Sequence, residues 1–200
     1  NIEQQLREAG ILNAKRESKA LLSLVLNCSY GDVDLWPERE IPQDVEKLLS
    51  SHLKRRIKRE PFAYIASKVS FLDCEIDVAP EVLIPRQETE ILVDRIIKEL
   101  EKEDLSGKVL WDMCTGSGCI GISIKQRFPQ LEVVLIDVCP KALALAERNA
   151  QKNEVKVTCV LSDFFTNLEG SKADYFICNP PYVSEDEYEV LESEVKDYEP

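Results

Sequence analysis

The sequence predicts an α/β protein in which a small helical domain precedes a parallel sheet with helices packed against it. The first sixty residues have only helical periodicity, residues 108–178 alternate between strand and helix patterns, and a glycine-rich turn follows the first of those strands. At 200 residues the chain is long enough for two domains. We expect a helical domain at 1–59, a β-hairpin linker at 60–87 and an α/β domain at 88–200.

The first domain is expected to consist of amphipathic helices. Residues 1–9 give a short helical pattern, and apolar residues keep the i, i+3, i+4, i+7 spacing over 14–28 and 44–59. His52 lies on the apolar stripe of the last helix, so we predict a residue at the edge of the core and not a catalytic base. The basic run Lys54–Arg59 indicates either a local basic patch or partners of the helix dipole.

A β-hairpin is predicted after Pro61. Apolar residues alternate with polar ones from Leu72 to Val78, as in a half-buried strand. Residues 79–81 (Ala-Pro-Glu) indicate a turn, and residues 82–84 a returning strand.

The rest of the chain predicts repeated strand–helix–strand units. After a helix at 89–100, strands are expected at 108–112, 132–137, 155–161 and 173–178, with helices at 120–127 and 140–152. This alternation predicts right-handed crossovers and a parallel sheet. The stretch 185–199 holds eight acids and one lysine, and we expect it to be a solvated surface helix or loop.

Composition narrows the class of protein. With 37 acidic and 25 basic residues the net charge is -12, which argues against a broad nucleic-acid surface because phosphate contacts need Lys and Arg. Seven cysteines without a CxxC pair, and one histidine, predict no metal site. No membrane span or signal peptide is recognisable, so we expect a cytoplasmic protein.

The first chemical motif is Asp112-Met113-Cys114-Thr115-Gly116-Ser117-Gly118, at the end of a strand. Together with Gly121 it fits G-x-G-x-x-G, in which glycines allow a tight turn and a close approach of a ligand to the backbone. Asp137 ends the next strand and can accept hydrogen bonds from ribose hydroxyls. The pattern predicts a Rossmann-like site for an adenosine-containing cofactor, either NAD or S-adenosylmethionine.

The second motif, Asn179-Pro180-Pro181-Tyr182, follows the strand at 173–178. Prolines stiffen the backbone, so the Asn179 side-chain oxygen and the Pro180 carbonyl can be held in one arrangement. Two such acceptors suit a planar NH₂ group, whose delocalised lone pair makes it a poor nucleophile that needs orientation and transition-state stabilisation. Tyr182 is expected to stack on the planar group.

This chemistry selects S-adenosylmethionine over NAD. We predict that Asn179, Pro180 and Tyr182 are catalytic, that Pro181 lies with them against the substrate, and that Asn179 also contacts the cofactor. Asp163, which follows the strand at 155–161, is expected to accept from the adenine amine. The predicted cofactor-binding residues are Asp112, Thr115, Gly116, Ser117, Gly118, Asp137, Asp163 and Asn179.

Taken together, these motifs resemble the HemK-type glutamine N5-methyltransferases that modify peptide chain release factors. The resemblance extends to Arg59–Ile65, Val82–Glu90, Asp137–Leu143 and Asn149-Ala150, and thus over essentially the whole chain. One departure is Gln87, which stands where the family has a proline.

The resemblance implies a helical domain that docks the release factor, a hairpin linker and a seven-stranded methyltransferase domain. By match of motif, Asn179 and Pro180 would bind the glutamine amide of a Gly-Gly-Gln loop. The protein would act as a monomer with S-adenosylmethionine as its cofactor. About twenty residues follow the Asn-Pro-Pro-Tyr motif, where the family continues further, so we expect a C-terminally truncated chain. Four residues would lie near the cleft: Phe62, Tyr64, Arg86 and Glu88.

The sequence leaves three alternatives open. An adenine-N6 nucleic-acid methyltransferase would use the same motif on a flipped base. A ribosomal-protein glutamine methyltransferase is a close relative. A non-catalytic fragment that binds only cofactor or partner is also compatible with a truncated chain.

Overall fold

The chain folds into two compact units. The computed structural model describes residues 1–35 and 40–200. The first unit comprises Asn1–Ala66 with Glu192–Tyr198, and the second Ser67–Leu191 with Glu199–Pro200. Across these described residues, no helix is long and apolar enough to cross a membrane.

The first unit is helical, as the periodicity predicts, and the three expected helices are confirmed with ends that differ by at most two residues. Its core is formed by apolar side chains of the helices and of Ile11, between α1 and α2. The helices are α1 (Ile2–Glu8), α2 (Ala14–Leu26), α3 (Asp32–Leu35), α4 (Gln43–Ile57), α5 (Phe62–Ala66) and α10 (Ser193–Lys196). The buried core residues are Leu6, Ile11, Ala14, Leu21, Leu49, Leu53 and Ile65.

The basic run at the end of α4 is largely paired inside this unit. Arg56 is 3% exposed. Its Nε lies 2.5 Å from Glu17 Oε2, and an Nη atom lies 3.0 Å from Glu194 Oε1. Arg59 also reaches Glu194, at 3.0 Å. Arg55 pairs with Glu60 at 2.5 Å. The run is therefore not an open basic patch, because all three of its arginines hold carboxylates of the same unit.

The prediction of a solvated acidic stretch at 185–199 is wrong at two positions. Glu194 pairs with Arg56, and the Glu199 side chain is only 2% exposed because it binds Arg86. Acidic composition could not reveal this, since both arginines lie more than 100 residues earlier in the sequence.

The second unit begins with the hairpin, whose position differs from the prediction. Strand β1 (Lys68–Phe71) pairs antiparallel with β2 (Cys74–Asp77) around a two-residue turn at 72–73. Leu72 adopts a left-handed φ of +50° in that turn. Residues 82–84 form no strand. The turn was missed because Leu-Asp lacks the glycine or asparagine that normally marks such turns.

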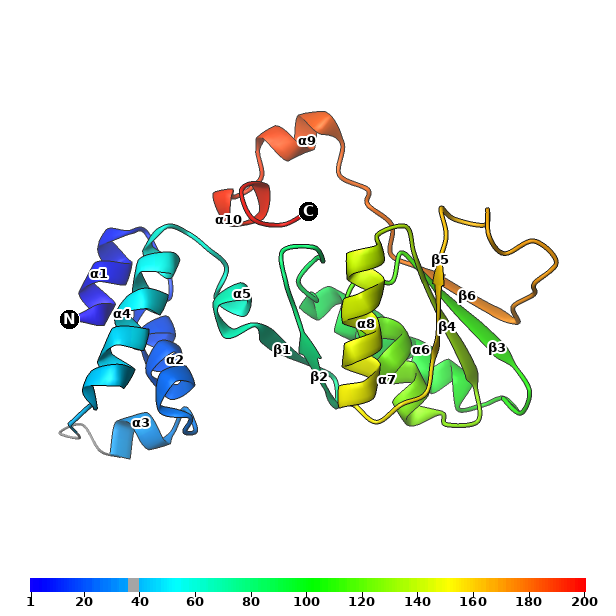
Figure 1. Cartoon of the computed structure of the whole chain (residues 1–200), viewed down its shortest axis with the longest axis horizontal. Coiled ribbons are helices and arrows are strands. Elements are labelled where there is room, and N and C mark those ends of the chain that lie inside the picture. The colour runs from blue at the N-terminus through cyan, green and yellow to red at the C-terminus, as the bar shows by residue number, and fades with distance from the viewer. Residues whose placement is uncertain (36–39) are drawn as a thin grey trace. The chain divides into compact units, whose positions relative to one another are not determined.

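A four-stranded parallel sheet forms the rest of the unit, with strand order β5-β4-β3-β6, as the alternating pattern predicts (Figure 1). Helices α7 and α8 contact the sheet. The strands are β3 (Val109–Met113), β4 (Glu132–Asp137), β5 (Thr158–Leu161) and β6 (Tyr175–Cys178). The helices are α6 (Gln87–Leu100), α7 (Cys119–Arg127), α8 (Pro140–Lys152) and α9 (Glu185–Glu189).

Helix α6 begins at Gln87, so the glutamine occupies the first helical position. Proline is favoured there, because its fixed φ suits the helix and its missing N–H is not needed. The preceding Arg86 is extended, with φ −102° and ψ 152°, which is the backbone that a following proline requires.

Gln87→Pro should therefore raise the free energy of unfolding by about 0.4–1 kcal/mol, chiefly by restricting the unfolded chain. Urea denaturation of Gln87→Pro beside Gln87→Ala measures this effect, since alanine removes the same exposed side chain without fixing φ. A proline variant less stable than the alanine variant would contradict the expectation.

Candidate active site

The carboxyl ends of the parallel strands bring the two sequence motifs to one edge of the sheet. Met113 at the end of β3 is opposite Ile136 of β4 and Cys178 of β6. The glycine loop, Asp137 and Asn179 follow these positions directly in the chain. Ligands of doubly wound sheets bind at this edge, so the fold places both motifs where the sequence predicted them.

The conformation of the glycine loop is fixed by backbone hydrogen bonds and by close packing around Gly118. The Gly116 N–H donates to Asp137 Oδ2 at 2.8 Å, and the Gly118 N–H donates to the Thr115 carbonyl at 2.9 Å. Gly118 has φ +83° and precedes α7. A Cβ there would lie 2.8 Å from Ile122 Cδ1. Glycine is therefore required at Gly118 by both its backbone conformation and its packing.

Asp112 is fully buried at the end of β3. Its Oδ2 accepts hydrogen bonds from Thr115 Oγ1 at 2.6 Å and from the Gly121 N–H at 2.9 Å. Its Oδ1 is buried and has no hydrogen-bond partner in the described part of the chain. Burial raises the pKa of Asp112 to about 6, with a further contribution from Asp137 and against the effect of the two hydrogen bonds.

A cavity of about 60 Å³ lies between the glycine loop and Asn179. The half-buried Asn179 lines it from the end of β6, and no hydrogen bond among the described residues uses its side chain. The cavity unites four predicted residues of the two motifs. Its lining comprises Leu83, Pro85, Arg86, Thr89, Cys114, Thr115, Gly116, Ser117, Cys119, Ile120 and Asn179.

Other predicted residues lie outside this cavity. Pro180, Pro181 and Tyr182 are exposed, and Tyr182 is 78% exposed. Asp163 is exposed in the turn after β5, where its carbonyl accepts from the Thr166 N–H at 3.1 Å. Their roles in binding stay predictions.

Two of the four residues expected near the cleft by resemblance belong to the helical unit. Phe62 packs against its core, and Tyr64 is buried in the same unit. Glu88 is exposed on the first turn of α6. Arg86 does line the cavity, and an Nη atom donates to Glu199 Oε1 at 2.5 Å.

The sequence reasoning missed the lining contributed just before and within α6, namely Leu83, Pro85 and Thr89. It also missed Cys114, whose Sγ lies 4.0 Å from Cys178 Sγ on the neighbouring strand. Burial, together with Cys178, raises the pKa of Cys114 to about 12, so it is a neutral thiol. Only the strand register could have revealed this pair, because the two cysteines are 64 residues apart.

The site fits S-adenosylmethionine in two respects. At Gly116, which lines the cavity, the loop presents backbone without a side chain that would block a ligand. The unpartnered Asp112 Oδ1 is a buried acceptor, which is rarely left unsatisfied in a folded protein and suits the ammonium group of a methionine moiety.

Comparison with protein families gives two matches. Residues 87–196 match the family "Methyltransferase small domain", and residues 1–66 match "PrmC N-terminal domain". Together with the sheet and the glycine loop, these matches define an α/β methyltransferase that uses S-adenosylmethionine.

Curated relatives identify the family. The chain is 38% identical over 197 residues to the release factor glutamine methyltransferase of Chlamydia trachomatis serovar L2, covering 98% of the chain and 67% of the relative. It is 35% identical over 198 residues to that of Koribacter versatilis, covering 98% and 70%. The chain belongs to the release factor glutamine methyltransferase family, and it spans about two thirds of the length of these relatives.

Proposed function

We propose that the chain transfers a methyl group from S-adenosylmethionine to the side-chain amide nitrogen of the glutamine in the Gly-Gly-Gln motif of peptide chain release factors. One observation carries the proposal: Asn179 and the glycine loop line the same cavity. A substrate amide bound to Asn179 would thus lie beside the cofactor loop. The relatives' names give the substrate class.

The role of Asn179 and Pro180 follows from the chemistry of an amide. The nitrogen lone pair of glutamine is delocalised into the carbonyl, so nucleophilic attack requires it to become pyramidal. The Asn179 Oδ1 and Pro180 carbonyl would accept the two N–H hydrogens and hold the lone pair toward the methyl group. Acceptors fixed in this way stabilise the developing positive charge without a strong base.

The cofactor supplies an electrophilic methyl group on a sulfonium. The glycine loop, with Thr115 and Ser117, would bind its methionine end, and the Asp137 carboxylate its ribose. Asp163 would accept from the adenine amine, and Tyr182 would cover the substrate amide. Asp112 would bind the cofactor's ammonium group through its free Oδ1.

This role for Asp112 predicts a pH dependence of cofactor binding. Its pKa of about 6 lies above the ordinary value of 3.8, so the carboxyl contributes stability that is present below pH 3.8 and is lost as the pH rises through 6. The cofactor's ammonium group favours the ionised form. Binding below pH 6 must therefore release a proton, and affinity for S-adenosylhomocysteine should be about tenfold weaker at pH 5 than at pH 7.

Isothermal titration calorimetry at both pH values, in buffers of different ionisation enthalpy, measures the affinity and the proton release. Asp112→Asn keeps the shape of the side chain but cannot ionise. The variant should therefore bind S-adenosylhomocysteine more weakly than the unmodified chain, and its affinity should depend little on pH. If the unmodified chain bound S-adenosylhomocysteine equally well at pH 5 and pH 7, the proposed contact between Asp112 and the ammonium group would be wrong.

The proposed activity is tested by incubating the chain with a release factor and labelled S-adenosylmethionine, followed by peptide mass spectrometry. We expect one added methyl group on the Gly-Gly-Gln glutamine. Parallel incubations with ribosomal proteins, DNA and RNA separate the other methyltransferase classes. Methyl transfer only to one of those substrates would refute the proposal. So would the absence of any methyl transfer by a folded chain that binds cofactor.

We further propose that the protein is a cytoplasmic monomer.

A further inference from the structure

Asn149 is a fully buried polar residue on α8, a helix that contributes no lining residue to the active-site cavity. Both hydrogens of its amide are donated to carbonyls, one to Ser117 at 2.8 Å and one to Asp77 at 3.0 Å. Its Oδ1 accepts from the Asp77 N–H at 2.8 Å. The one side chain thus connects the cofactor loop to the end of hairpin strand β2.

The bond to Ser117 acts on a particular peptide plane. The Ser117 carbonyl and the Gly118 N–H belong to the same peptide group, and the N–H donates to the Thr115 carbonyl at 2.9 Å. Asn149 and Thr115 therefore hold the two ends of one plane. Gly118 lies on its C-terminal side with φ +83°. Glycine populates both signs of φ readily, so this peptide could rotate if its carbonyl were not held.

We infer that Asn149 is a positioning residue, which fixes the Ser117–Gly118 peptide in the orientation that binds the cofactor. The inference rests on the proposed function, because it assigns the cofactor to this loop. No acidic or apolar residue of similar size could replace the amide, since two carbonyls require two donors. An apolar residue would leave the Ser117 and Asp77 carbonyls and the Asp77 N–H without hydrogen bonds. Each of these buried groups would then lower the stability of the fold by its uncompensated desolvation energy.

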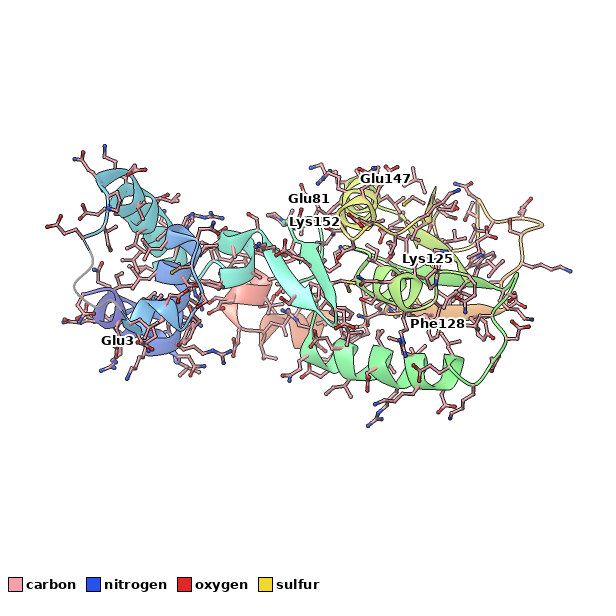
Figure 2. The ribbon with its side chains drawn as sticks, turned by 90° about the horizontal axis from the view of Figure 1, so that it is seen from below. Glu3, Glu81, Lys125, Phe128, Glu147 and Lys152 are labelled. Carbon is pink, nitrogen blue, oxygen red and sulfur yellow. The ribbon has the colours of Figure 1, made fainter. Side chains whose placement is uncertain are left out.

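The chain contains a matched control one helical turn later. Asn153 Nδ2 donates to the Glu75 carbonyl at 2.9 Å and to the Asn149 backbone carbonyl at 2.8 Å, and Asn153 Oδ1 accepts from the Glu75 N–H at 3.1 Å. Asn153 thus holds the same strand, two residues earlier, with the same kind of contact. It has no hydrogen bond to the glycine loop within the described residues. Lys152, which is labelled in Figure 2, lies between them in sequence. It also reaches β2, since its Nζ lies 2.7 Å from Glu75 Oε1.

Variants of the two asparagines can therefore distinguish two roles, holding the hairpin against α8 and positioning the glycine loop. Asn149→Asp and Asn153→Asp each keep the acceptor for β2 and remove both donors. Both should lower the melting temperature. Only Asn149→Asp should weaken binding of S-adenosylhomocysteine, by tenfold or more in calorimetry, while Asn153→Asp should stay within twofold of the unmodified chain.

Kinetics give a second readout that loss of stability alone would not change. In the release-factor assay Asn149→Asp should raise the KM for S-adenosylmethionine tenfold or more and leave kcat at saturation within threefold. If Asn149→Asp does not fold, Asn149→Ser, which adds no charge, is measured against the same thresholds.

A folded Asn149 variant that binds S-adenosylhomocysteine within twofold of the unmodified chain would overturn the inference, as would equal weakening by Asn153→Asp. Failure of the proposed function has a different signature. In that case the unmodified chain would bind S-adenosylhomocysteine without methylating a release factor, and the affinities of the two variants would still decide the role of Asn149.

Discussion

Asn179→Ala is expected to reduce methyl transfer to a release factor by a factor of about 10² to 10³, the range found when one stabilising side chain is removed from a reacting centre. The physical reason is the loss of the acceptor that would orient the glutamine amide. Cofactor affinity should change far less, since the glycine loop, Asp112 and Asp137 are untouched. Single-turnover rates at saturating cofactor, with calorimetry for binding, measure both quantities.

Asn167→Ala is the control for this experiment. Asn167 is an exposed asparagine in the segment after β5, where its Nδ2 donates to the Leu161 carbonyl at 2.8 Å, and it does not line the cavity. Its removal should leave the rate within about twofold. A rate for Asn179→Ala close to that of the unmodified chain would place the substrate amide elsewhere.

Gly118→Ala should lower the free energy of unfolding by about 2–5 kcal/mol. A left-handed φ costs an alanine roughly 1–2 kcal/mol, and forcing an added methyl into a filled core costs typically about 1–3 kcal/mol. The methyl would lie 2.8 Å from Ile122 Cδ1 and 3.1 Å from Ala146 Cβ. The Ile122 methyl can turn aside, but Ala146 Cβ is fixed to the backbone of α8, so relief of this overlap would shift α8 against the loop and cofactor binding should also weaken.

Gly107→Ala separates these two effects. Gly107 has a similar left-handed φ of +69°, but a Cβ there would have no neighbour within 4 Å. Urea denaturation should therefore show a loss of only about 1–2 kcal/mol for Gly107→Ala. Equal losses for the two variants would show that the surroundings of Gly118 relax around the methyl at no measurable cost.

The α/β unit was predictable because its signals are local. Each strand is a short apolar run, Pro140 marks the start of its helix, and the glycine motif fixes where the first strand ends. Parallel strands then bring their carboxyl ends together whatever the loops contain. This is why Asn179 and the glycine loop could be placed at one edge from sequence alone.

The remaining features depend on contacts between residues distant in sequence. The turn at Leu72 lacks the usual turn residues, and the Glu90 carboxylate of α6 holds it by accepting from the Leu72 N–H at 2.9 Å. Asn149 resembles an ordinary polar residue of an amphipathic helix until the three backbone groups around it are known. No pattern within one segment encodes such partners.

The pairing of Arg56 with Glu194 has a consequence for synthesis on the ribosome. The two residues are 138 positions apart, so α4 and its neighbouring helices are translated long before their last carboxylate exists. Until then the guanidinium has the Glu17 carboxylate and the Glu60 carbonyl as its partners. Domains generally fold as they emerge, but in this protein the N-terminal helices gain the ion pair with Glu194 only after α10 has been translated.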